Sequence, residues 1–370
     1  MHAVAKRIIL SAGGTGGHLT PAFALAHDLR DRGYTVHLVM DRRGGRYGLP
    51  VPDGITVHTI HAGTLGRGII AKIKGLAGLA AGLVQARILI ARLKPSVVVG
   101  FGGYPSFPAL RAAQSIRIPT VIHQSDAVLG KANAMLAPRT DRIALSWPDT
   151  KGLADDDAVR AVVTGNPVRP EISALYNKPY PPLDDDGPIR LFVTGGSLGA
   201  HIFAAVVPGA LARLSESVKT RLDVTQQCRA EDLEQVRTAY EAAGIAATCE
   251  TFFNDVHERL SAAHLFIGRS GASTVSEIAV VGRPAIFVPY PHHVDRQQTI
   301  NAESLAREGG AWIIAQEDFT EETLSDQIGA LIADPQKLFH AAEAARSCGK
   351  PDAARRLGNL VTALASGWDR

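Results

Sequence analysis

Short aliphatic and β-branched runs alternate along the chain with longer stretches in which apolar residues recur every three or four positions. This alternation predicts β-α-β units, in which helices cover a parallel sheet. The short runs predict strands at Arg7–Ser11, Thr35–Met40, Val97–Gly100, Thr120–His123, Arg142–Leu145, Arg190–Thr194, Leu222–Gln226, Leu265–Gly268 and Ala285–Val288. The longer stretches predict helices at Pro21–Arg32, Gly63–Lys94, Arg111–Ile116 and Ala230–Ala243, one beginning at His201, and helical structure from Pro335 to Trp368.

The pattern stops at a predicted turn, Gly165-Asn166-Pro167, and restarts after a proline-rich linker that ends near Gly187. At 370 residues the chain is too long for one ordinary core and fits two domains of about 150–200 residues each. We expect an α/β protein with two Rossmann-like domains, residues 1–168 and 169–345, that face each other across a cleft. Residues 346–370 are expected to form a C-terminal helix that either caps the second domain or crosses back to the first.

Composition places the chain among ordinary globular proteins, with 46% hydrophobic and 20% charged residues. Its three cysteines match neither a metal pattern nor a disulfide framework, which indicates a reducing compartment. No signal peptide is expected at the N-terminus, and no run reaches the roughly 18 uninterrupted apolar residues of a membrane span.

Charge is distributed unevenly between the two halves. Residues 1–170 carry 21 Lys and Arg against 10 Asp and no Glu, whereas the remainder carries 18 against 26. We therefore expect only the first half to meet an anionic surface or ligand. Within it, the segment Gly63–Lys94 interleaves apolar and basic residues, either as a helix that lies on an anionic bilayer or as a core-facing helix with a basic outer face. The residues expected to contact the membrane are Ile69, Ile70, Lys72, Ile73 and Lys74.

The first glycine-rich turn, Gly13-Gly14-Thr15-Gly16-Gly17, joins a predicted strand to a predicted helix. Glycines there let the backbone approach a ligand closely and aim N–H groups at it. The spacing matches neither the usual dinucleotide fingerprint nor a P-loop, although Asp41 would imitate a ribose-binding acid. A tight turn without a ligand is the other alternative. His18 follows at the helix N-terminus, where a lowered pKa would keep it neutral and basic.

A second turn of this kind, Thr194-Gly195-Gly196-Ser197-Leu198-Gly199, follows the first strand of the second half. It predicts an anion site in which the Ser197 hydroxyl is an added donor. Two such turns at equivalent places indicate that both halves serve one ligand cleft.

Two later segments carry polar groups that suit a sugar nucleotide. Ala272–Thr274 would present backbone groups at a helix start, and Glu277 either accepts hydrogen bonds from ribose hydroxyls or is the carboxylate of a capping box. Gln297 and Gln298 each offer a donor and an acceptor to hexose hydroxyls. We expect no metal site at the adjacent His292 and His293, and we interpret the acidic runs Asp155–Asp157 and Asp184–Asp186 as solvated linkers.

In their order and spacing these motifs resemble the MurG family of bacterial peptidoglycan glycosyltransferases. The resemblance covers nearly the whole chain and rests on Gly13–His18, Gly102-Gly103-Tyr104, Gly165–Arg169, Gly195-Gly196-Ser197, Arg269–Ala272 and Asp295–Gln298. It implies a GT-B fold and an inverting transfer of N-acetylglucosamine from UDP-GlcNAc to the 4-hydroxyl of undecaprenyl-pyrophosphoryl-MurNAc-pentapeptide, which converts lipid I to lipid II. It also implies a peripheral protein on the anionic cytoplasmic face of the bacterial inner membrane, with no cofactor, metal ion or nucleic acid.

Transferred position by position, the resemblance implies a role for each motif. His18 would be the general base, with Thr15, Gly16 and Gly17 on the acceptor side. The second domain would hold most of the donor. Its implied contacts are Arg169 and Ser197 with the diphosphate, Phe253, Ala272, Ser273 and Thr274 with the uracil, Glu277 with the ribose, and Gln297 and Gln298 with the sugar.

One string departs from the family, which usually reads His-Glu-Gln-Asn where this chain reads His123-Gln124-Ser125-Asp126. Asp126 stands where the family has an amide assigned to the donor or acceptor sugar, and Gln124 replaces a carboxylate. An extra anion near two pyrophosphates should weaken binding unless another group compensates, or should shift the acceptor preference. Two alternatives therefore stay open: a GT-B transferase with another acceptor, such as diacylglycerol, and an inactive sugar-nucleotide binding protein.

Overall fold

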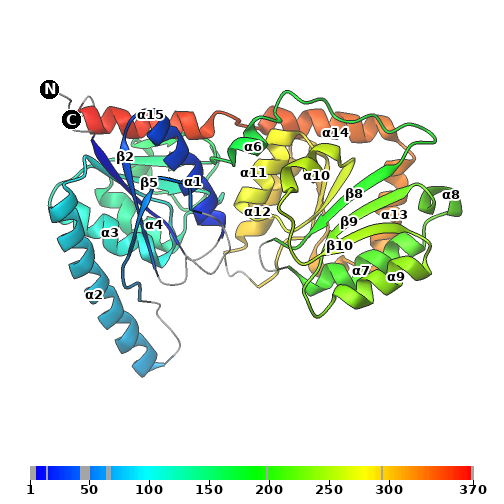
Figure 1. Ribbon diagram of the computed structural model, residues 1–370, viewed down its shortest axis with the longest axis horizontal. Helices are drawn as coiled ribbons and strands as arrows, with labels where there is room; N and C mark the ends of the chain where they lie inside the picture. Colours follow the sequence, from blue (N-terminus) through cyan, green and yellow to red (C-terminus); the bar gives the residue numbers. More distant parts are fainter. Residues whose placement is uncertain are drawn as a thin grey trace. The chain divides into compact units, whose positions relative to one another are not determined.

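The computed structural model describes residues 6–13, 16–41, 51–63, 68–196, 199–292 and 295–367, and in the helix Ile69–Leu93 it describes the side chains from Gly75 onward. The chain forms two compact units (Figure 1), one of residues 1–169 with 352–370 and the other of residues 170–351. Each unit is built on its own parallel sheet with a Rossmann-type strand order.

The sheet of the first unit has the strand order β3-β2-β1-β4-β5-β6-β7. Its strands are β1 (Arg7–Ser11), β2 (Thr35–Met40), β3 (Thr56–Thr59), β4 (Val97–Gly100), β5 (Thr120–Gln124), β6 (Arg142–Leu145) and β7 (Ala161–Val163). Ile9 of β1 lies opposite His37 of β2 on one side and Val98 of β4 on the other. Because the strand order reverses between β1 and β4, the turns that follow these two strands diverge at the carboxyl edge of the sheet.

Alternating side chains of the central strands bury two separate cores. Ile8 and Leu10 pack against α1 (Gly16–Asp31) and α15 (Ala353–Ser366), whereas Ile9 packs on the opposite face against α2 (Ile69–Leu93), α3 (Gly103–Ser115) and α4 (Lys131–Leu136). Helix α15 lies along α1 (Figure 1) and buries Leu357 and Val361 in this core. The C-terminal helix therefore completes the core of the first unit.

The second unit repeats the architecture with the strand order β10-β9-β8-β11-β12-β13. Its strands are β8 (Ile189–Thr194), β9 (Leu222–Gln227), β10 (Ala246–Glu250), β11 (Leu265–Gly268), β12 (Ala285–Phe287) and β13 (Ala311–Ile313). Its helices are α6 (Pro170–Ser173), α7 (His201–Ala212), α8 (Glu216–Lys219), α9 (Leu233–Ala242), α10 (Val256–Ala262), α11 (Ala272–Val281), α12 (Gln297–Ala306), α13 (Glu321–Ile332) and α14 (Pro335–Cys348). The strand order reverses between β8 and β11, as it does in the first unit between β1 and β4.

Every strand that the sequence predicts is present to within one residue at each end. The strands that the pattern misses are β3, β7, β10 and β13, which form the outer edges of the two sheets. An edge strand is buried less completely, so it lacks the continuous apolar run of a central parallel strand. The residues of β10 illustrate this, because only Cys249 among them is buried.

Two predicted helices begin earlier than expected. Helix α1 begins at Gly16 instead of Pro21, and α3 begins at Gly103 instead of Arg111. Pro21 and Pro108 lie inside these helices, each as the sixth residue, so each removes one intrahelical hydrogen bond without ending its helix. Both helices therefore start directly at the turns that follow β1 and β4.

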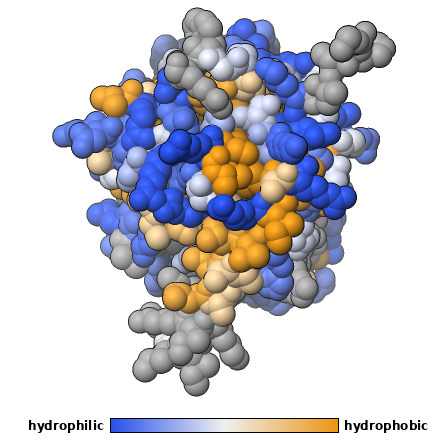
Figure 2. All heavy atoms as spheres, turned by 90° about the vertical axis from the view of Figure 1, so that its left-hand side faces the viewer, coloured by the Kyte–Doolittle hydropathy of each residue, from blue (hydrophilic) through white to orange (hydrophobic). Residues whose placement is uncertain are grey.

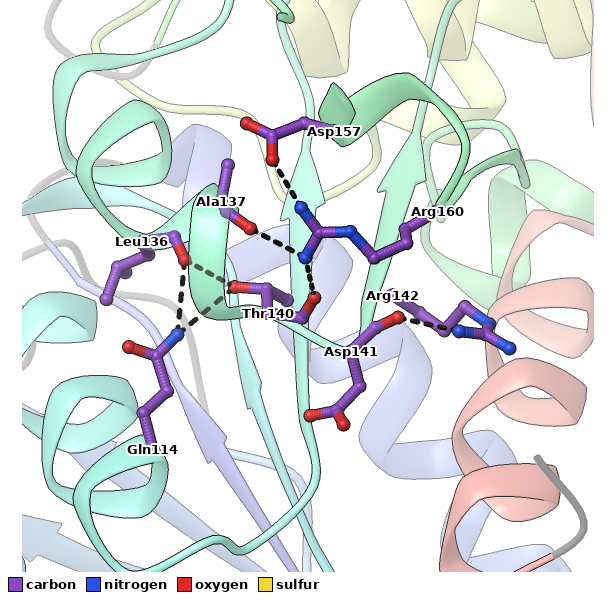
Figure 3. Close-up of polar contacts among 8 residues, drawn as sticks. All are labelled: Gln114, Leu136, Ala137, Thr140, Asp141, Arg142, Asp157 and Arg160. Atoms are coloured by element: carbon purple, nitrogen blue, oxygen red, sulfur yellow. Dashed lines mark hydrogen bonds and ion pairs between the residues drawn. The ribbon is translucent and has the colours of Figure 1, made fainter. Parts of the chain in front are cut away.

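The interpretation of Asp155–Asp157 as a solvated linker is wrong for Asp157, whereas Asp155 and Asp156 are exposed as expected. These residues form a short helix, α5 (Asp155–Ala158), in which Asp157 is buried and pairs with Arg160. Arg160 also donates hydrogen bonds to the carbonyls of Ala137 and Thr140 (Figure 3). Asp184–Asp186 are exposed, as expected.

Helix α2 buries one narrow stripe and exposes apolar side chains on the rest of its surface. Among the described residues the buried stripe consists of Gly75, Gly82, Ala86 and Ile90, whereas Leu76, Val84 and Ile88 are 62%, 59% and 64% exposed. Figure 2 shows a band of hydrophobic side chains, flanked by hydrophilic ones, on the face where α2 lies. The alternative of a core-facing helix with a basic outer face is therefore wrong for Leu76 and Leu83.

By length and composition, Gly75–Leu93 is the one segment among the described residues that would suffice to cross a bilayer. However, the segment packs along α3 within the first unit. A side chain at Gly82 would collide with the carbonyl of His61 and lie 3.3 Å from Pro108. Glycine at this position lets the helix approach the rest of the unit closely.

We predict that Gly82→Ala destabilises the protein by about 1–3 kcal/mol, because the new methyl group has no room. Gly329→Ala in α13 is the matched control, since its Cβ would lie 3.6 Å from Leu214. That substitution should instead stabilise the protein by about 0.5–1 kcal/mol, the usual gain of alanine over glycine in a helix. Urea denaturation of both variants measures the difference, and equal effects would contradict the close approach.

Candidate active site

The carboxyl edge of the first unit ties together the turns after β1 and β4. The Ser106 hydroxyl lies 2.7 Å from the carbonyl oxygens of both Ser11 and Gly102. The Ser11 hydroxyl donates in turn to the carbonyl of Pro105, at 3.2 Å. Gly102 and Gly103 have φ angles of 89° and 72°, which favour glycine. Hydrogen bonds from buried serines thus hold the two turns against each other.

His18 lies in the first turn of α1. Its Nδ1 is 3.1 Å from the carbonyl oxygen of Gly13. A carbonyl can only accept, so Nδ1 carries the proton and Nε2 keeps its lone pair. Burial lowers the pKa of His18, while the Asp126 carboxylate and the Gly13 carbonyl oppose this shift. His18 therefore presents a neutral imidazole with a basic Nε2.

Gly102 leaves space beside that nitrogen. A Cβ at Gly102 would lie 3.2 Å from Nε2 of His18 and 3.8 Å from Nδ2 of Asn133. Any side chain at residue 102 would therefore crowd Nε2. The Gly102-Gly103 pair is a structural requirement for access to His18.

His123, the neighbouring histidine on β5, has a different environment. It is fully buried, its Nε2 lies 3.3 Å from the carbonyl oxygen of Gly165, and its ring packs 5.4 Å from that of Phe101. Burial lowers the pKa of His123 to about 4. It is therefore a neutral residue that ties β5 to the turn after β7.

Two buried amides lie at this edge: the sequence motifs do not include Asn133, and they include Asn166 without a role. Among the described residues, Oδ1 of Asn133 and both amide atoms of Asn166 lack a hydrogen-bond partner. A buried polar atom without a hydrogen-bond partner costs about 1–3 kcal/mol of stability. We therefore expect a polar ligand group or a water molecule to form a hydrogen bond with each of these atoms. Asn133 begins no recognisable motif, and only its packing beside Gly102 identifies it.

The glycine turn of the second unit lies between β8 and α7. The Gly196 N–H donates to the Thr194 hydroxyl at 3.1 Å, and the Gly199 N–H donates to the Gly196 carbonyl at 3.0 Å. Gly196 and Gly199 have φ angles of 85° and 66°. A side chain at Gly195 would collide with Ala200. Gly196 and Gly199 are thus joined by a hydrogen bond shortly before the N-terminus of α7, a place that suits phosphate.

Helix α11 begins at Ala272 with Gly271 as its N-cap, so Ala272, Ser273 and Thr274 form its first turn. Glu277 lies beyond this turn, and the N-cap is a glycine without a side chain. The capping-box interpretation of Glu277 is therefore wrong, because that motif needs Ser or Thr at the N-cap and Glu three residues later. The ribose interpretation stays a prediction.

Arg269 and Ser270 hold the loop after β12 in place. Nη1 of Arg269 donates to the carbonyls of Val288 and Pro289, at 2.8 and 3.1 Å. The Ser270 hydroxyl donates to the backbone carbonyl of Gln298 at 2.8 Å. These contacts attach the start of α12, which carries Gln297 and Gln298, to the turn that leads into α11.

The two glutamines make different local contacts. The side-chain oxygen of Gln298 accepts the N–H of Tyr290 at 3.0 Å, so its amide group is oriented by the loop. The side-chain nitrogen of Gln297 lies 3.1 Å from a carboxylate oxygen of Asp295. Both side chains are partly exposed at the carboxyl edge of the sheet.

The ring of Phe253 is buried in an aromatic cluster. It packs edge-on at 6.2 Å from Phe192, and the guanidinium of Arg259 lies 4.5 Å from its centroid. Because the ring is already occupied, any contact of Phe253 with a base would involve its main chain. Arg169, the last residue of the first unit, is half-buried.

Several predicted residues lie outside the described residues: Thr15, Ser197, His293 and the side chains of Ile69, Ile70, Lys72, Ile73 and Lys74. The residues that the structure does describe contain no cluster of three or more His, Cys, Asp or Glu side chains that would hold a metal ion.

Comparison with known proteins agrees with this architecture over the whole chain. Residues 8–145 match the glycosyltransferase family 28 N-terminal domain, and residues 190–357 match the C-terminal domain of the same family. The crystal structure of MurG from Acinetobacter baumannii has a TM-score of 0.77 and 31% identity, covering 96% of this chain and 99% of that one.

Two curated relatives are named UDP-N-acetylglucosamine--N-acetylmuramyl-(pentapeptide) pyrophosphoryl-undecaprenol N-acetylglucosamine transferase. The one from Rhodospirillum centenum is 50% identical over 358 residues, 97% of this chain and 94% of that protein. The one from Rhodospirillum rubrum is 49% identical over 362 residues, 97% of this chain and 92% of that protein.

Two Rossmann-like units, each with a glycine turn at the carboxyl edge of its sheet, define a GT-B glycosyltransferase. The chain belongs to glycosyltransferase family 28. The predicted fold class and the resemblance to MurG are both confirmed.

We predict that Gly102→Ala displaces the His18 imidazole and impairs glycosyl transfer. Gly33→Ala is the matched control, because Gly33 has a similar φ of 84° but open space around its Cβ. Both variants should lose about 1–2 kcal/mol of stability from backbone strain. Only Gly102→Ala should move the His18 imidazole resonances in an NMR spectrum, and unchanged resonances would contradict the crowding of Nε2.

Proposed function

We propose that the chain is an inverting transferase that moves N-acetylglucosamine from UDP-GlcNAc to the muramoyl 4-hydroxyl of undecaprenyl-pyrophosphoryl-MurNAc-pentapeptide, converting lipid I to lipid II. The curated relatives that match nearly the full chain are named for this reaction. The observation in the site that carries the proposal is the basic Nε2 of His18, with Gly102 leaving room beside it.

The second unit is proposed to bind the donor. The turn at Gly195–Gly199 and the start of α7 would receive the diphosphate, together with Arg169 and Ser197. The first turn of α11, from Ala272 to Thr274, would frame the uracil with the main chain of Phe253. Glu277 would hold the ribose, and Gln297 and Gln298 the sugar hydroxyls, on the loop that Arg269 anchors.

The first unit is proposed to bind the acceptor and supply the base. Nε2 of His18 would accept the proton of the acceptor 4-hydroxyl, and that oxygen would form a bond to C1 of N-acetylglucosamine. The bond from C1 to the diphosphate breaks in the same displacement, which inverts the anomeric centre. The electron pair leaves on UDP, where N–H groups of the glycine turn and helix N-termini would stabilise the charge.

The proposed location is the cytoplasmic face of the bacterial inner membrane, with α2 as the contact. Its exposed Leu76, Val84 and Ile88 form an apolar surface, and the exposed Arg87 and Arg92 lie on the same helix. Apolar side chains next to basic ones favour an anionic bilayer surface. Lys72 and Lys74 would extend the basic contact towards the start of the helix.

The direct test is turnover of UDP-GlcNAc with a lipid-linked muramoyl acceptor, with the product identified by mass spectrometry. Formation of the disaccharide product supports the proposal. Turnover only with another acceptor, such as diacylglycerol, would identify a different GT-B transferase. Donor binding without turnover of either acceptor would identify a sugar-nucleotide binding protein.

We predict that His18→Ala lowers kcat by about 10²–10⁴-fold, the usual contribution of a general base. Donor affinity, measured by calorimetry, should stay unchanged. His27→Ala on the same helix is the control and should keep wild-type turnover. Because burial lowers the pKa of His18, wild-type activity should decline only below the usual pKa of histidine. Wild-type turnover by His18→Ala would refute the role of the base.

We predict that replacing Leu76, Val84 and Ile88 together by Gln weakens binding to vesicles that contain anionic lipid, because the apolar contact is lost. Val159→Gln is the control, since Val159 is 84% exposed but lies far from α2 in sequence, next to α5. Binding should also weaken with added salt and with Lys72→Gln and Lys74→Gln. Sedimentation that ignores salt or survives loss of both lysines would argue against the electrostatic contact.

A further inference from the structure

Gln124, at the end of β5, uses its whole side-chain amide to hold the loop that follows. Its Nε2 donates to the backbone carbonyls of Asp126, at 3.1 Å, and Val128, at 2.7 Å. Its Oε1 accepts the N–H of Gly130 at 3.1 Å and Nδ2 of Asn133 at 2.8 Å. Gln124 is buried, so these bonds form away from competing water.

Only an amide makes this set of contacts. Two of the four bonds need a donor and the other two need an acceptor, and a glutamine provides both. A carboxylate at residue 124 would face the carbonyls of Asp126 and Val128 without a hydrogen to offer. The choice of glutamine therefore determines the path of the backbone on which Asp126 lies.

The held loop also connects directly to the surroundings of His18. Nδ2 of Asn133 donates a hydrogen bond to Oε1 of Gln124. A Cβ placed at Gly102 would lie 3.8 Å from this nitrogen and 3.2 Å from Nε2 of His18, so Asn133 and His18 both lie beside Gly102. Asn133 donates in addition to the backbone carbonyl of His123 at 3.1 Å. Gln124 thus joins β5, its loop and α4 into one framework beside the proposed base.

Asp126 lies on the held loop, two residues after Gln124, which donates a hydrogen bond to its carbonyl, and its charge acts on His18. The carboxylate raises the pKa of His18 against the larger effect of burial, and the Gly13 carbonyl acts in the same direction. Other titratable groups among the described residues near this site include His123, which is neutral, Asp41 beside Gly13, and Tyr104 in the first turn of α3. Among the charges that shift the pKa of His18, the Asp126 carboxylate raises it.

We propose that Gln124 is a positioning residue whose amide fixes residues 125–130 so that the Asp126 carboxylate stays beside the His18 imidazole. When His18 accepts the proton of the acceptor hydroxyl, the Asp126 carboxylate is then the counter-ion of the imidazolium that forms. The imidazolium in turn balances the extra negative charge of residue 126 during the transfer. This inference rests on the proposed function for its catalytic meaning, but the positioning itself is testable without turnover.

The experiment is a double-mutant cycle on the full-length protein, read by NMR titration of the His18 imidazole. The variants are Asp126→Asn, Gln124→Met and the double variant, where Met keeps the length of Gln but makes none of its hydrogen bonds. Asp126→Asn should lower the pKa of His18. In the Gln124→Met background the same substitution should shift it by less than half as much, because the carboxylate is no longer held in place.

Gln114→Glu is the matched control. The Gln114 amide donates to the Leu136 carbonyl at 3.2 Å and to the Thr140 hydroxyl at 3.3 Å (Figure 3), so it anchors the end of α4 in a similar way. None of the hydrogen bonds described for Gln114 reaches residues 125–130. This variant should lose stability because the donor is missing, but the effect of Asp126→Asn on His18 should be that of the wild type.

Equal shifts in both backgrounds, or no shift with Asp126→Asn in the wild type, would overturn the inference. If Gln124→Met does not fold, Gln124→Glu replaces it, since it keeps both accepted bonds and loses both donated ones. The added carboxylate is present both in Gln124→Glu and in the double variant with Asp126→Asn, so its own effect on the pKa of His18 cancels when the two are compared. A coupling that disappears with Gln124→Glu supports the inference, and one that persists at the wild-type size overturns it.

Kinetics separate this inference from the proposed function. If His18 is the base, Asp126→Asn should lower kcat by about tenfold, less than loss of the base itself, and move the acid limb of the kcat/KM profile to lower pH. Coupling seen by NMR with an unchanged acid limb would support the positioning by Gln124 and refute His18 as the base. Absence of coupling, together with an acid limb that Asp126→Asn does move to lower pH, would refute the positioning by Gln124 and support His18 as the base.

Discussion

The reversal of strand order in each parallel sheet is the constraint on which the rest of the structure depends. Between β1 and β4, and again between β8 and β11, consecutive turns leave the carboxyl edge in opposite directions. The backbone must turn sharply there, and glycines with positive φ allow it, as at Gly102 and Gly196. Candidate residues follow these strands, as His18 follows β1 and Ala272 follows β11, and also neighbouring strands, as Asp126 follows β5 and Gln297 follows β12. The carboxyl ends of parallel strands are where open α/β sheets bind ligands.

The environment of His18 shows how opposing effects set the character of one side chain. Burial favours the neutral imidazole, whereas the Asp126 charge and the Gly13 carbonyl favour the protonated one. His123, which is fully buried and on which the charge of His18 acts and not that of a carboxylate, has its pKa lowered to about 4. The two histidines at this edge therefore lie in different electrostatic environments, and the Asp126 charge opposes the effect of burial at His18 but not at His123.

Helix α2 illustrates where periodicity alone misleads. Its many apolar residues favoured neither the core nor a membrane, because both environments accept the same side chains. The close approach at Gly82 decides which stripe faces the unit, and this leaves Leu76, Val84 and Ile88 outside. Similarly, Glu277 fits a capping box by spacing, but α11 begins at Ala272, a position that depends on where β11 ends.

The sequence by itself determined the central strands, the two Rossmann-like repeats, the glycine turns and the family, because buried parallel strands and sharp turns demand particular residues locally. The edge strands, the docking of α15 on α1, the role of Gln124 and the proximity of Asn133 to Gly102 were decided only by the tertiary structure. These features depend on contacts between residues far apart in the chain, and a hydrogen-bonding side chain such as glutamine has many possible partners until the fold selects among them.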